Sequence, residues 1–475
     1  MTVPNALPVQ ADSTLLRSGF SPDLFITDPG MTASYTRDRT GSYVGTPFAV
    51  ARPRTTADLS AIMVRCGELG LGVVPQGGLT GLVGAGVSGA VEPEVVVILD
   101  RMSAIRSVDP VSYTMVVEAG CVLETAKQAA DAQDCLLPIT FGAQGSARIG
   151  GNVSTNAGGF NVLRYGMTRD LVLGLEVVLP DGRIWDGLRT LRKDNRGYDL
   201  KQLFIGAEGT LGIVTAAAFR LFPRPTQVET ALLGLRSVED AMNFYAKARR
   251  SCSDLLSAFE LVMRDGLVLG IGHRPELGEP LGEPCPVYVL MEVAACGVVD
   301  LRHVLETCLE DAGELLMDGT IASSKAQADR LWLHREAMVE AQSRHGPYYR
   351  TDVSVSINVI PAFLDQAMAD LATFLPEGRP YAYGHIGDGN IHLNVVPPAD
   401  WAMEQRQALF RRAEDVIFST LDRFGGSISA EHGIGRSKKR AFLERVDPVT
   451  LDLFRTLKKA IDPAYRLSKG RIFDA

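Results

Sequence analysis

The chain contains 475 residues, of which 46% are hydrophobic and 22% are charged. This length and composition supply enough apolar material for two or three domains with hydrophobic cores, which excludes an intrinsically disordered protein. The formal net charge of −8 lacks the basic excess of proteins that bind nucleic acid or anionic membranes, so neither partner is expected. No stretch of about 18 apolar residues occurs, and no transmembrane helix is predicted.

The seven cysteines are odd in number, lie scattered along the chain and form no Cys-x-x-Cys pair. This usage is typical of reduced thiols in a cytosol-like compartment. The first ten residues lack both the apolar core of a secretory signal and the Arg-rich pattern of a transit peptide, so we predict no targeting segment there. Together these observations favour a cytoplasmic protein.

Glycine is dense between about residues 43 and 225, where short strand-like runs such as 94–99 and 171–179 alternate with short helical patterns. The alternation predicts a mixed α/β domain with functional loops. From residue 227 to about 425 the pattern changes to longer amphipathic helices that alternate with strands. This change favours an antiparallel sheet covered by helices, of the ferredoxin-like kind.

The clearest domain boundary is the segment 222–226, where two prolines separated by one residue interrupt both helix and sheet. After this boundary, helices are predicted over 237–250, 300–311, 361–374 and 448–461, and strands over 286–293 and 353–359.

Three glycine-rich segments have the composition of ligand-binding loops, namely 75–86, 145–159 and 205–215. Glycine permits positive φ and lets the backbone approach a ligand closely, so the N–H groups of such a loop can surround a pyrophosphate. No P-loop sequence occurs, and the loop at Gly77 does not open a Rossmann unit with the dinucleotide fingerprint. On composition alone, a purely structural role for each loop stays open.

The sequence around Asp388-Gly389 contains the most specific metal-ligand pattern of the chain. Asp-Gly is a strong signal for a two-residue type I′ hairpin turn, because both residue types tolerate positive φ. In that register His385 faces His392, with Cβ atoms roughly 5 Å apart on one face. Asn394 lies two residues further along the same strand and therefore on the same face.

The best candidate for a third ligand is Glu431, in the segment 429–436. Two histidines and one carboxylate form a ligand set of catalytic zinc and of ferrous iron that leaves positions open for water or substrate, and we expect zinc here. His432 would project to the opposite face of an extended segment, although a turn at Gly433 would relax that constraint. The alternative is that these histidines are ordinary polar residues of glycine-rich loops.

Five segments, in order along nearly the whole chain, resemble the motifs of the FAD-linked D-2-hydroxy acid dehydrogenases, which belong to the vanillyl-alcohol oxidase or p-cresol methylhydroxylase superfamily. These segments are 75–86, 149–159, 205–215, 384–395 and 429–435. The resemblance implies an α+β fold. It would have a two-subdomain FAD-binding domain over 1–225, a ferredoxin-like antiparallel-sheet substrate domain over 226–425, and a C-terminal helical return over 426–475 that completes the flavin and metal site.

The resemblance also implies FAD as cofactor. Several members of the superfamily attach the flavin through a histidine of the first domain, whereas this chain has no histidine before His273, so we expect non-covalent FAD. The residues that the resemblance assigns to FAD are Pro75, Gln76, Gly77, Gly78, Leu79, Thr80, Gly81, Gly145, Ser146, Gly150, Asn152, Thr155, Gly158, Gly159, Glu208, Gly209, Gly212 and Ile213.

Within the family, the chain most resembles the D-2-hydroxyglutarate dehydrogenase branch, with D-lactate dehydrogenases and the D subunit of glycolate oxidase as neighbours. That branch holds a substrate carboxylate with an Arg, a Thr and a Lys, and the matching positions here are Arg335, Val339 and Arg350. Two guanidinium groups can still hold a carboxylate, so a dicarboxylate such as D-2-hydroxyglutarate or D-malate remains a plausible substrate.

At the other end of the substrate, the resemblance implies that Asn394 contacts the C1 carboxylate, with Lys438 or Lys439 as alternatives. Surface solvation is the simpler interpretation of either lysine. Near the C-terminus the family reads Asn-Pro-Gly-Lys beside the flavin, whereas this chain reads Ser-Lys-Gly-Arg over 468–471, so no flavin contact is assigned there.

The implied reaction is oxidation of a D-2-hydroxy acid such as D-2-hydroxyglutarate, D-malate or D-lactate, by hydride transfer from its Cα to flavin N5. A metal held by His385, His392 and Glu431 would lower the pKa of the substrate hydroxyl, and His432 would remove the hydroxyl proton. The expected electron acceptor is electron-transfer flavoprotein or a quinone, and a homodimer is possible. The alternatives are an oxidase that uses dioxygen and a non-catalytic flavin or metal sensor.

Overall fold

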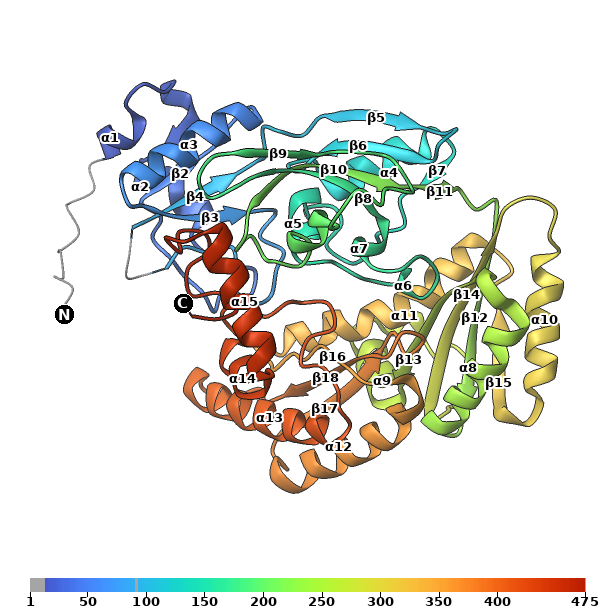
Figure 1. Ribbon diagram of the computed structural model, residues 1–475. Coiled ribbons are helices and arrows are strands. Elements are labelled where there is room, and N and C mark those ends of the chain that lie inside the picture. Colours follow the sequence, from blue (N-terminus) through green and yellow to red (C-terminus); the bar gives the residue numbers. More distant parts are fainter. Residues whose placement is uncertain (1–12, 90–92, 475) are drawn as a thin grey trace. The chain divides into compact units, whose positions relative to one another are not determined.

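The computed structural model describes residues 13–89 and 93–474 and divides into two compact units, each considered separately (Figure 1). The first unit comprises the described residues up to 158, residues 167–223 and residues 431–474, and the second comprises residues 159–166 and 224–430. The chain thus changes unit after Pro223 and again at Glu431, where the sequence suggested 225 and 426. The first ten residues, for which no targeting segment is predicted, lie outside the described part.

Two larger sheets and the two-stranded pair of β7 (Cys135–Leu136) and β11 (Phe222–Pro223) build the first unit. In the four-stranded sheet β1-β2-β4-β3 the last three strands are parallel, and helix α3 (Thr56–Glu68) connects β2 to β3. The five-stranded sheet β5-β6-β10-β8-β9 is antiparallel. The strands are β1 (Phe25–Ile26), β2 (Ala49–Ala51), β3 (Gly72–Gln76), β4 (Glu94–Ile98), β5 (Ile105–Asp109), β6 (Thr114–Glu118), β8 (Val172–Val178), β9 (Ile184–Gly187) and β10 (Ile213–Arg220).

One antiparallel seven-stranded sheet builds the second unit, in the order β15-β12-β14-β13-β17-β18-β16. This arrangement confirms the predicted α+β class with a helix-covered antiparallel sheet. Its strands are β12 (Gln227–Leu235), β13 (Leu256–Met263), β14 (Val287–Ala295), β15 (Leu316–Ile321), β16 (Val353–Ser354), β17 (Arg379–Gly384) and β18 (Asn390–Val396).

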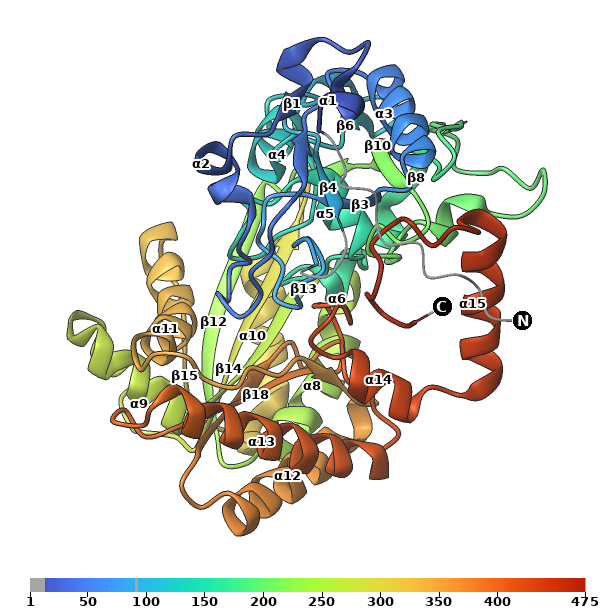
Figure 2. The ribbon, with the colours of Figure 1, turned by 90° about the vertical axis from the view of Figure 1, so that its left-hand side faces the viewer.

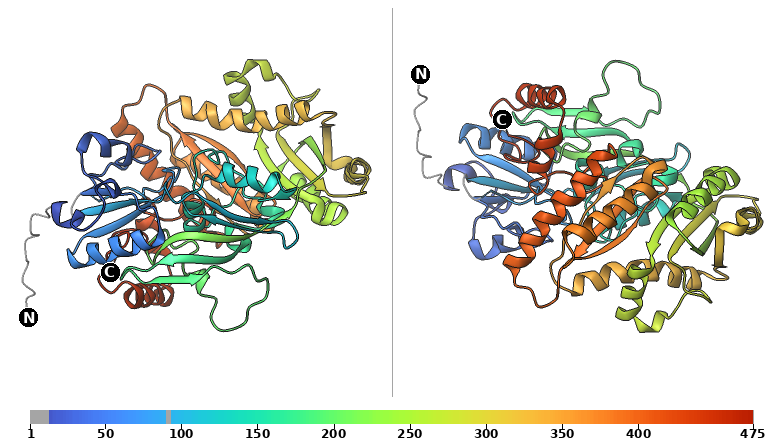
Figure 3. Two further views of the ribbon diagram at one scale, coloured as in Figure 1. Left: turned by 90° about the horizontal axis from the view of Figure 1, so that it is seen from above. Right: turned by 90° about the horizontal axis from the view of Figure 1, so that it is seen from below.

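Helices cover both faces of this sheet (Figure 2). Alternation along β13 shows the two faces, because Phe259 contacts Phe244 of α8 whereas Val262 packs with Leu267 of α9 and Leu331 of α11. Helices α12 and α13 lie side by side, and α12 packs on α8 (Figure 3). The helices are α8 (Val238–Cys252), α9 (Arg264–His273), α10 (Leu301–Ala312), α11 (Lys325–Arg344), α12 (Ile360–Phe374) and α13 (Met403–Arg423).

Most predicted elements of this unit are confirmed within one or two residues, as is the C-terminal helix α15 (Pro448–Ile461) of the first unit. The predicted strand over 353–359 is wrong, because only its first two residues form β16 and a 3₁₀ turn follows at Ile357–Val359. Ser354 pairs with both Asn390 and Ser427, so the strand ends where its two neighbours diverge. Among the described residues, no helix combines the length and hydropathy that crossing a bilayer would require.

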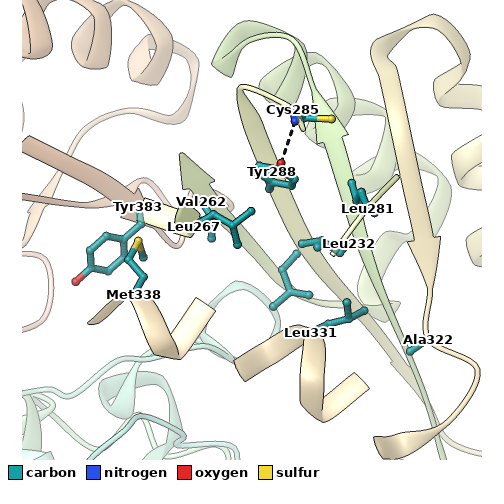
Figure 4. Packing of buried hydrophobic residues seen from close by; sticks show 11 residues of the cluster. Leu232, Val262, Leu267, Leu281, Cys285, Tyr288, Ala322, Leu331, Met338 and Tyr383 are labelled. Atoms are coloured by element: carbon teal, nitrogen blue, oxygen red, sulfur yellow. Dashed lines mark hydrogen bonds between the residues drawn. The ribbon is translucent and has the colours of Figure 1, made fainter. Parts of the chain in front are cut away.

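The hydrophobic core between the sheet and α11, drawn in Figure 4, determines where Arg335 of α11 lies. Leu331 and Met338 are buried in a cluster with Leu232 and Tyr383. Arg335 stands four residues after the first and three before the second, so a helix places it on the same face. Its side chain is correspondingly buried, with 5% of the residue exposed.

Candidate active site

The predicted two-residue turn at Asp388-Gly389 is wrong. The observed pairing places Tyr383 opposite His392, so the strands are joined by a longer loop. Of the Asp-Gly pair, Gly389 alone has a positive φ, +88°. Its carbonyl accepts the Val355 N–H at 3.1 Å, and this contact with a segment distant in sequence draws the loop out of the tight-turn geometry.

His385 and His392 nevertheless share one face, as predicted. The partner of His392 moves by two residues, from His385 to Tyr383, and side chains alternate with a period of two, so the face is preserved. The two imidazole centroids lie 5.6 Å apart with the rings at 84°. Both residues are buried, with 6% and 9% exposed.

Each of these rings has its Nδ1 atom beside an acceptor. Nδ1 of His385 lies 2.5 Å from a carboxylate oxygen of Glu260, and Nδ1 of His392 lies 3.3 Å from the carbonyl oxygen of Thr351. An ionised carboxylate and a carbonyl only accept hydrogen bonds, so both Nδ1 atoms donate and the lone pairs lie on the two Nε2 atoms. This tautomer suits a pair of metal ligands.

Glu260 connects His385 to Arg335. Its second carboxylate oxygen lies 3.3 Å from Nε of Arg335, whose guanidinium lies over the Tyr383 ring, 4.4 Å from its centroid. Burial raises the pKa of Glu260, but the hydrogen bond from His385 and the positive charge of Arg335 outweigh that effect and hold the pKa below its usual value. The carboxylate is therefore ionised among its partners.

Aromatic rings border this cluster. Phe160 makes edge contacts with His385 and with Trp332, with centroid distances of 5.2 Å in both cases. The guanidinium of Arg335 lies 5.7 Å from the same Phe160 ring. Phe160 belongs to the short excursion 159–166 into the second unit, which the sequence did not reveal.

Asn394 lies on the histidine face, as predicted, and is 1% exposed. Its amide nitrogen donates to Gln342 at 2.7 Å and to the Tyr383 hydroxyl at 3.1 Å, and its oxygen accepts the Thr351 N–H at 3.2 Å. These contacts fix the orientation of the amide. Its contact with a substrate carboxylate stays a prediction.

Arg350 is exposed and lies over the ring of Tyr348, 4.4 Å from the centroid, while donating to Ser343 at 3.2 Å. Burial raises the pKa of Tyr383 to about 12, and the positive charges of Arg335 and Arg350 both oppose that rise. Arg335 lies over the Tyr383 ring itself, whereas the ring that Arg350 covers is that of Tyr348.

Glu431 and His432 directly follow Ala430, the last residue of the second unit, and Ala430 is tied there by its N–H bond to the Asp352 carbonyl. The ligand atoms of His385 and His392 lie within 4.8 Å of each other, so this pair fits a divalent ion, whereas Glu431 belongs to the first unit and stays a predicted third ligand. Asp352, also of the second unit, offers a carboxylate oxygen within 4.8 Å of a ring nitrogen of His392. Placing His432 as general base and not as ligand stays a prediction.

Sequence reasoning missed Asp352 and Glu260. Asp352 is fully buried and accepts from the amide of Asn390 at 2.9 Å. Glu260 had a readable signal, since a single carboxylate inside the apolar run Ala258 to Val262 must find a partner if the strand is buried. Asp352 had no such signal, because it precedes the predicted strand over 353–359.

In the first unit, the loop after β3 closely approaches a second predicted loop. A Cβ added at Gly78 would lie 2.0 Å from the Ser146 carbonyl oxygen, so only glycine allows this contact. A Cβ added at Gly81 or Gly145 would meet no atom within 4 Å, which leaves open space beside the same loops. Bare backbone next to open space is what a bound pyrophosphate requires.

Two buried polar atoms near these loops have no hydrogen-bond partner among the described residues. They are the side-chain oxygen of Gln76 and the side-chain nitrogen of Asn152. The Gln76 amide nitrogen is by contrast satisfied by two carbonyl groups. An acceptor and a donor left open beside the glycine loops are available to a bound ligand, so the residues present fit FAD.

Not every residue predicted to bind FAD lies against that space. The Glu208 carboxylate accepts the N–H groups of Ile434 and Gly435 at 2.7 and 2.8 Å and thereby holds the C-terminal return. Burial raises its pKa, although these two hydrogen bonds oppose the rise. A Cβ at Gly209 would lie 2.4 Å from the Pro75 ring, and one at Gly212 would lie 2.6 Å from Val177, so both glycines serve close packing.

The remaining predicted FAD residues are distributed over four places. Gly77, Leu79 and Thr80 belong to the loop after β3, Gly150 and Thr155 to helix α5 (Ile149–Ser154) and its C-cap, and Gly158 and Gly159 to the point where the chain changes unit, with Ile213 opening β10.

The C-terminal segment of the first unit does not follow the family pattern. Arg471 is 2% exposed and donates to Glu94 at 2.9 Å and to the carbonyl of Val87 at 2.5 Å. Lys439 pairs with Asp474 at 2.5 Å, which agrees with a structural role for this lysine. Lys438, the residue before α14 (Lys439–Arg445), is 8% exposed, so it is not a solvated surface lysine.

Known proteins share this arrangement. The family described as "FAD linked oxidases, C-terminal domain" matches residues 224–472, and "FAD binding domain" matches residues 47–187. The chain belongs to the FAD-linked oxidase family. It is accordingly an FAD-dependent oxidoreductase, as predicted.

Two relatives cover almost all of the chain. "D-2-hydroxyglutarate dehydrogenase, mitochondrial" of Danio rerio is 36% identical over 97% of this chain and 85% of its own length. "D-2-hydroxyglutarate dehydrogenase" of Xanthomonas citri pv. viticola is 37% identical over 100% of this chain and 98% of its own length. The predicted family is therefore confirmed, and only the first of these two names states a compartment.

Two solved structures share the fold. The 4-ethylphenol oxidase of Gulosibacter chungangensis has a TM-score of 0.77 at 16% identity and covers 100% of this chain and 99% of its own. A p-cresol methylhydroxylase has a TM-score of 0.74 at 16% identity, with 97% and 96% covered. At such low identity these likenesses concern the fold alone, which is the one predicted.

Proposed function

We propose that this oxidoreductase converts a D-2-hydroxy acid with a second carboxylate, of the D-2-hydroxyglutarate class, to the 2-oxo acid, with FAD and a divalent ion, zinc, as its cofactors. The observation that carries this proposal is the buried pair His385 and His392 beside Arg335, with both Nδ1 atoms donating. The family and the names of its 36% and 37% identical relatives support the substrate class.

The residues have distinct roles in this proposal. Bound FAD supplies a two-electron acceptor, and the ion supplies Lewis acidity that lowers the pKa of the substrate hydroxyl. His385, His392 and Glu431 hold the ion. His432 accepts the hydroxyl proton on an imidazole nitrogen, a contribution typically worth about 10²–10⁴ in rate.

The far end of the substrate would meet Arg335 and Arg350, while Asn394 contacts the C1 carboxylate. Arg335 is rigid because Glu260 and Tyr383 hold its guanidinium, whereas Arg350 is exposed and adaptable. Val339 stands where the resemblance implies a threonine, so the guanidinium groups must supply the hydrogen bonds to the distal carboxylate. This composition favours D-2-hydroxyglutarate or D-malate over D-lactate.

Anaerobic bleaching of the flavin tests the proposal. The enzyme as purified is mixed with D-lactate, D-malate, D-2-hydroxyglutarate and their L enantiomers, then remeasured after chelation and after restoration of zinc. We expect fast bleaching by one D dicarboxylate, its loss with chelator and its return with zinc. A yellow protein that none of these acids reduces would contradict the proposed substrate class.

The acceptor, the assembly and the compartment complete the proposal. Electron-transfer flavoprotein or a quinone would reoxidise the flavin, the chain would form a homodimer, and it would work in the cytoplasm. Mixing the reduced enzyme with electron-transfer flavoprotein, a soluble quinone or dioxygen distinguishes the acceptors by the rate of flavin reoxidation. If dioxygen were the fastest, the enzyme would be an oxidase.

A further inference from the structure

Glu260 is the one charged residue of a buried and mostly apolar strand. It is 1% exposed and belongs to β13, which lies inside the seven-stranded sheet. Alternation puts its side chain on the same face as Val262, toward α11 and the two histidines. An ionised carboxylate at such a position requires strong partners, so the identity of those partners indicates its purpose.

The two oxygens of Glu260 hold two different parts of the proposed site. Oε1 accepts from Nδ1 of His385 at 2.5 Å, and Oε2 accepts from Nε of Arg335 at 3.3 Å. Neither oxygen is shared between the two, so each partner is oriented by its own hydrogen bond. His385 is a proposed metal ligand and Arg335 a proposed substrate ligand, so this one carboxylate contacts both parts of the proposed site.

We infer that Glu260 is a positioning residue that couples the metal ligand His385 to the substrate-binding Arg335. By accepting from Nδ1 it keeps the imidazole lone pair on Nε2, the atom that would bind the ion. By accepting a hydrogen bond from Nε of Arg335, it leaves the two terminal guanidinium nitrogens to donate to a substrate carboxylate in a bidentate pair. This inference rests on the proposed function and deepens it, because one side chain sets both metal affinity and substrate affinity.

Glu292 offers a matched control. It lies on the neighbouring strand β14, on the same sheet face, and is half-buried. Its oxygens accept from Trp332 at 3.2 Å and from Ser257 at 3.3 Å, and none of its recorded bonds reaches His385 or Arg335. The same change from Glu to Gln at the two positions therefore separates the loss of a buried carboxylate from the loss of this coupling.

The first readout is metal affinity, measured on the FAD-loaded enzyme as zinc retained per protein after equilibration with a graded chelator. We expect Glu260→Gln to bind zinc about 10–100-fold more weakly, the usual effect of losing the group behind a metal-bound histidine. Glu292→Gln should stay within about twofold of the parent protein, since its carboxylate supports no ligand. Equal zinc retention by parent and Glu260→Gln would overturn the inference.

The second readout is KM for the D dicarboxylate at saturating zinc. Glu260→Gln should raise this KM about tenfold, because Arg335 loses the charged partner that orients it, while Glu292→Gln should not change it. If Glu260 had a merely structural role, Glu260→Gln would lower flavin content and activity but would not specifically change zinc affinity and KM. An unchanged KM would overturn the substrate half of the coupling.

Glu260→Gln leaves Arg335 buried without its carboxylate, which can prevent folding. The double variant Glu260→Gln with Arg335→Met removes both charges and keeps the zinc test available. It should show the same 10–100-fold weaker zinc binding, and zinc binding equal to the parent would overturn the inference. Failure of the proposed function is distinguishable, since the parent protein itself would then retain no zinc, and the coupling would fall with it.

Discussion

The two candidate ligand sites of this protein differ in what they offer a ligand: one offers bare backbone, and the other offers buried polar side chains. In the first unit, the loops around Gly78 and Gly145 offer backbone and open space, and their contacts depend on the absence of side chains. In the second unit, His385, Arg335 and Glu260 are buried, and each side chain is held by another. The first site should therefore be sensitive to added bulk, and the second to lost charge or lost hydrogen bonds.

The largest effect is expected where a ring of the second site is removed. His392→Ala should abolish zinc retention. It should also lower kcat/KM by roughly three orders of magnitude, because stabilisation of transition-state charge by a bound ion is worth several kcal/mol and each 1.4 kcal/mol is tenfold. Flavin absorbance should be unchanged, since the glycine loops lie in the other unit. Exposed His303 provides the matched control, and His303→Ala should leave zinc content and rate intact. Normal zinc content in His392→Ala would remove this residue from the ligand set.

The glycine loops provide the reverse test. Gly145→Ala adds one methyl group into open space, so the apoprotein should have the same unfolding temperature as the parent apoprotein. Its affinity for FAD should fall roughly tenfold, because overpacking a filled site costs about 1–3 kcal/mol. Gly272→Ala in α9 makes the same change, also into open space, in the other unit and should not alter FAD affinity. Flavin fluorescence during titration of the apoprotein measures this. Undiminished FAD affinity in Gly145→Ala would mean that the space beside the loop is not the flavin site.

Charge removal at the rim of the second site should have a smaller and substrate-selective effect. Arg350→Met should raise KM for D-2-hydroxyglutarate about tenfold, since a hydrogen bond to a charged group is worth about 1.5–3 kcal/mol and this arginine is exposed. KM for D-lactate, which has no distal carboxylate, serves as the internal control and should move less than twofold. Steady-state rates with an artificial dye acceptor give both constants. Equal rises for the two acids would place Arg350 away from the distal carboxylate.

The same contrast explains what the sequence could predict. Motif spacing was sufficient to predict that His385 and His392 lie on one face. The observed register differs from the predicted one by two residues, and a shift by an even number of residues keeps a side chain on the same face. The register itself depends on the Val355 N–H bonding to Gly389, a contact between segments that no local pattern reports. Glu260 was readable as a charge in an apolar strand, whereas Phe160 was not, since its excursion into the second unit leaves no local signal. Glycine loops were found by composition, but Gly209 and Gly212 proved to serve packing.

The smallest effect is expected at a charge pair of the second unit that lies outside the site. Asp370 of α12 accepts from Thr420 at 2.6 Å and pairs with Arg423, whose side chain is 53% exposed. The hydrogen bond from Thr420 and the nearby Arg423 charge hold the pKa of Asp370 below its usual value. Because the folded pKa is lowered, the stabilisation is fully present above the unfolded pKa of about 3.9 and is lost as pH falls through the folded value.

Asp370→Asn should therefore lower the free energy of unfolding by less than about 1 kcal/mol at pH 7, as is usual for exposed pairs, with zinc and flavin content unchanged. The difference from the parent should shrink as the pH is lowered below 4 and also in high salt, where exposed charges are screened. Urea unfolding at pH 7 and pH 3.5 measures it. This arginine and carboxylate are chemically the same pair as Arg335 and Glu260, so burial and not residue type makes the pair at the site consequential. If Asp370→Asn weakened zinc binding as much as Glu260→Gln does, this distinction would be contradicted.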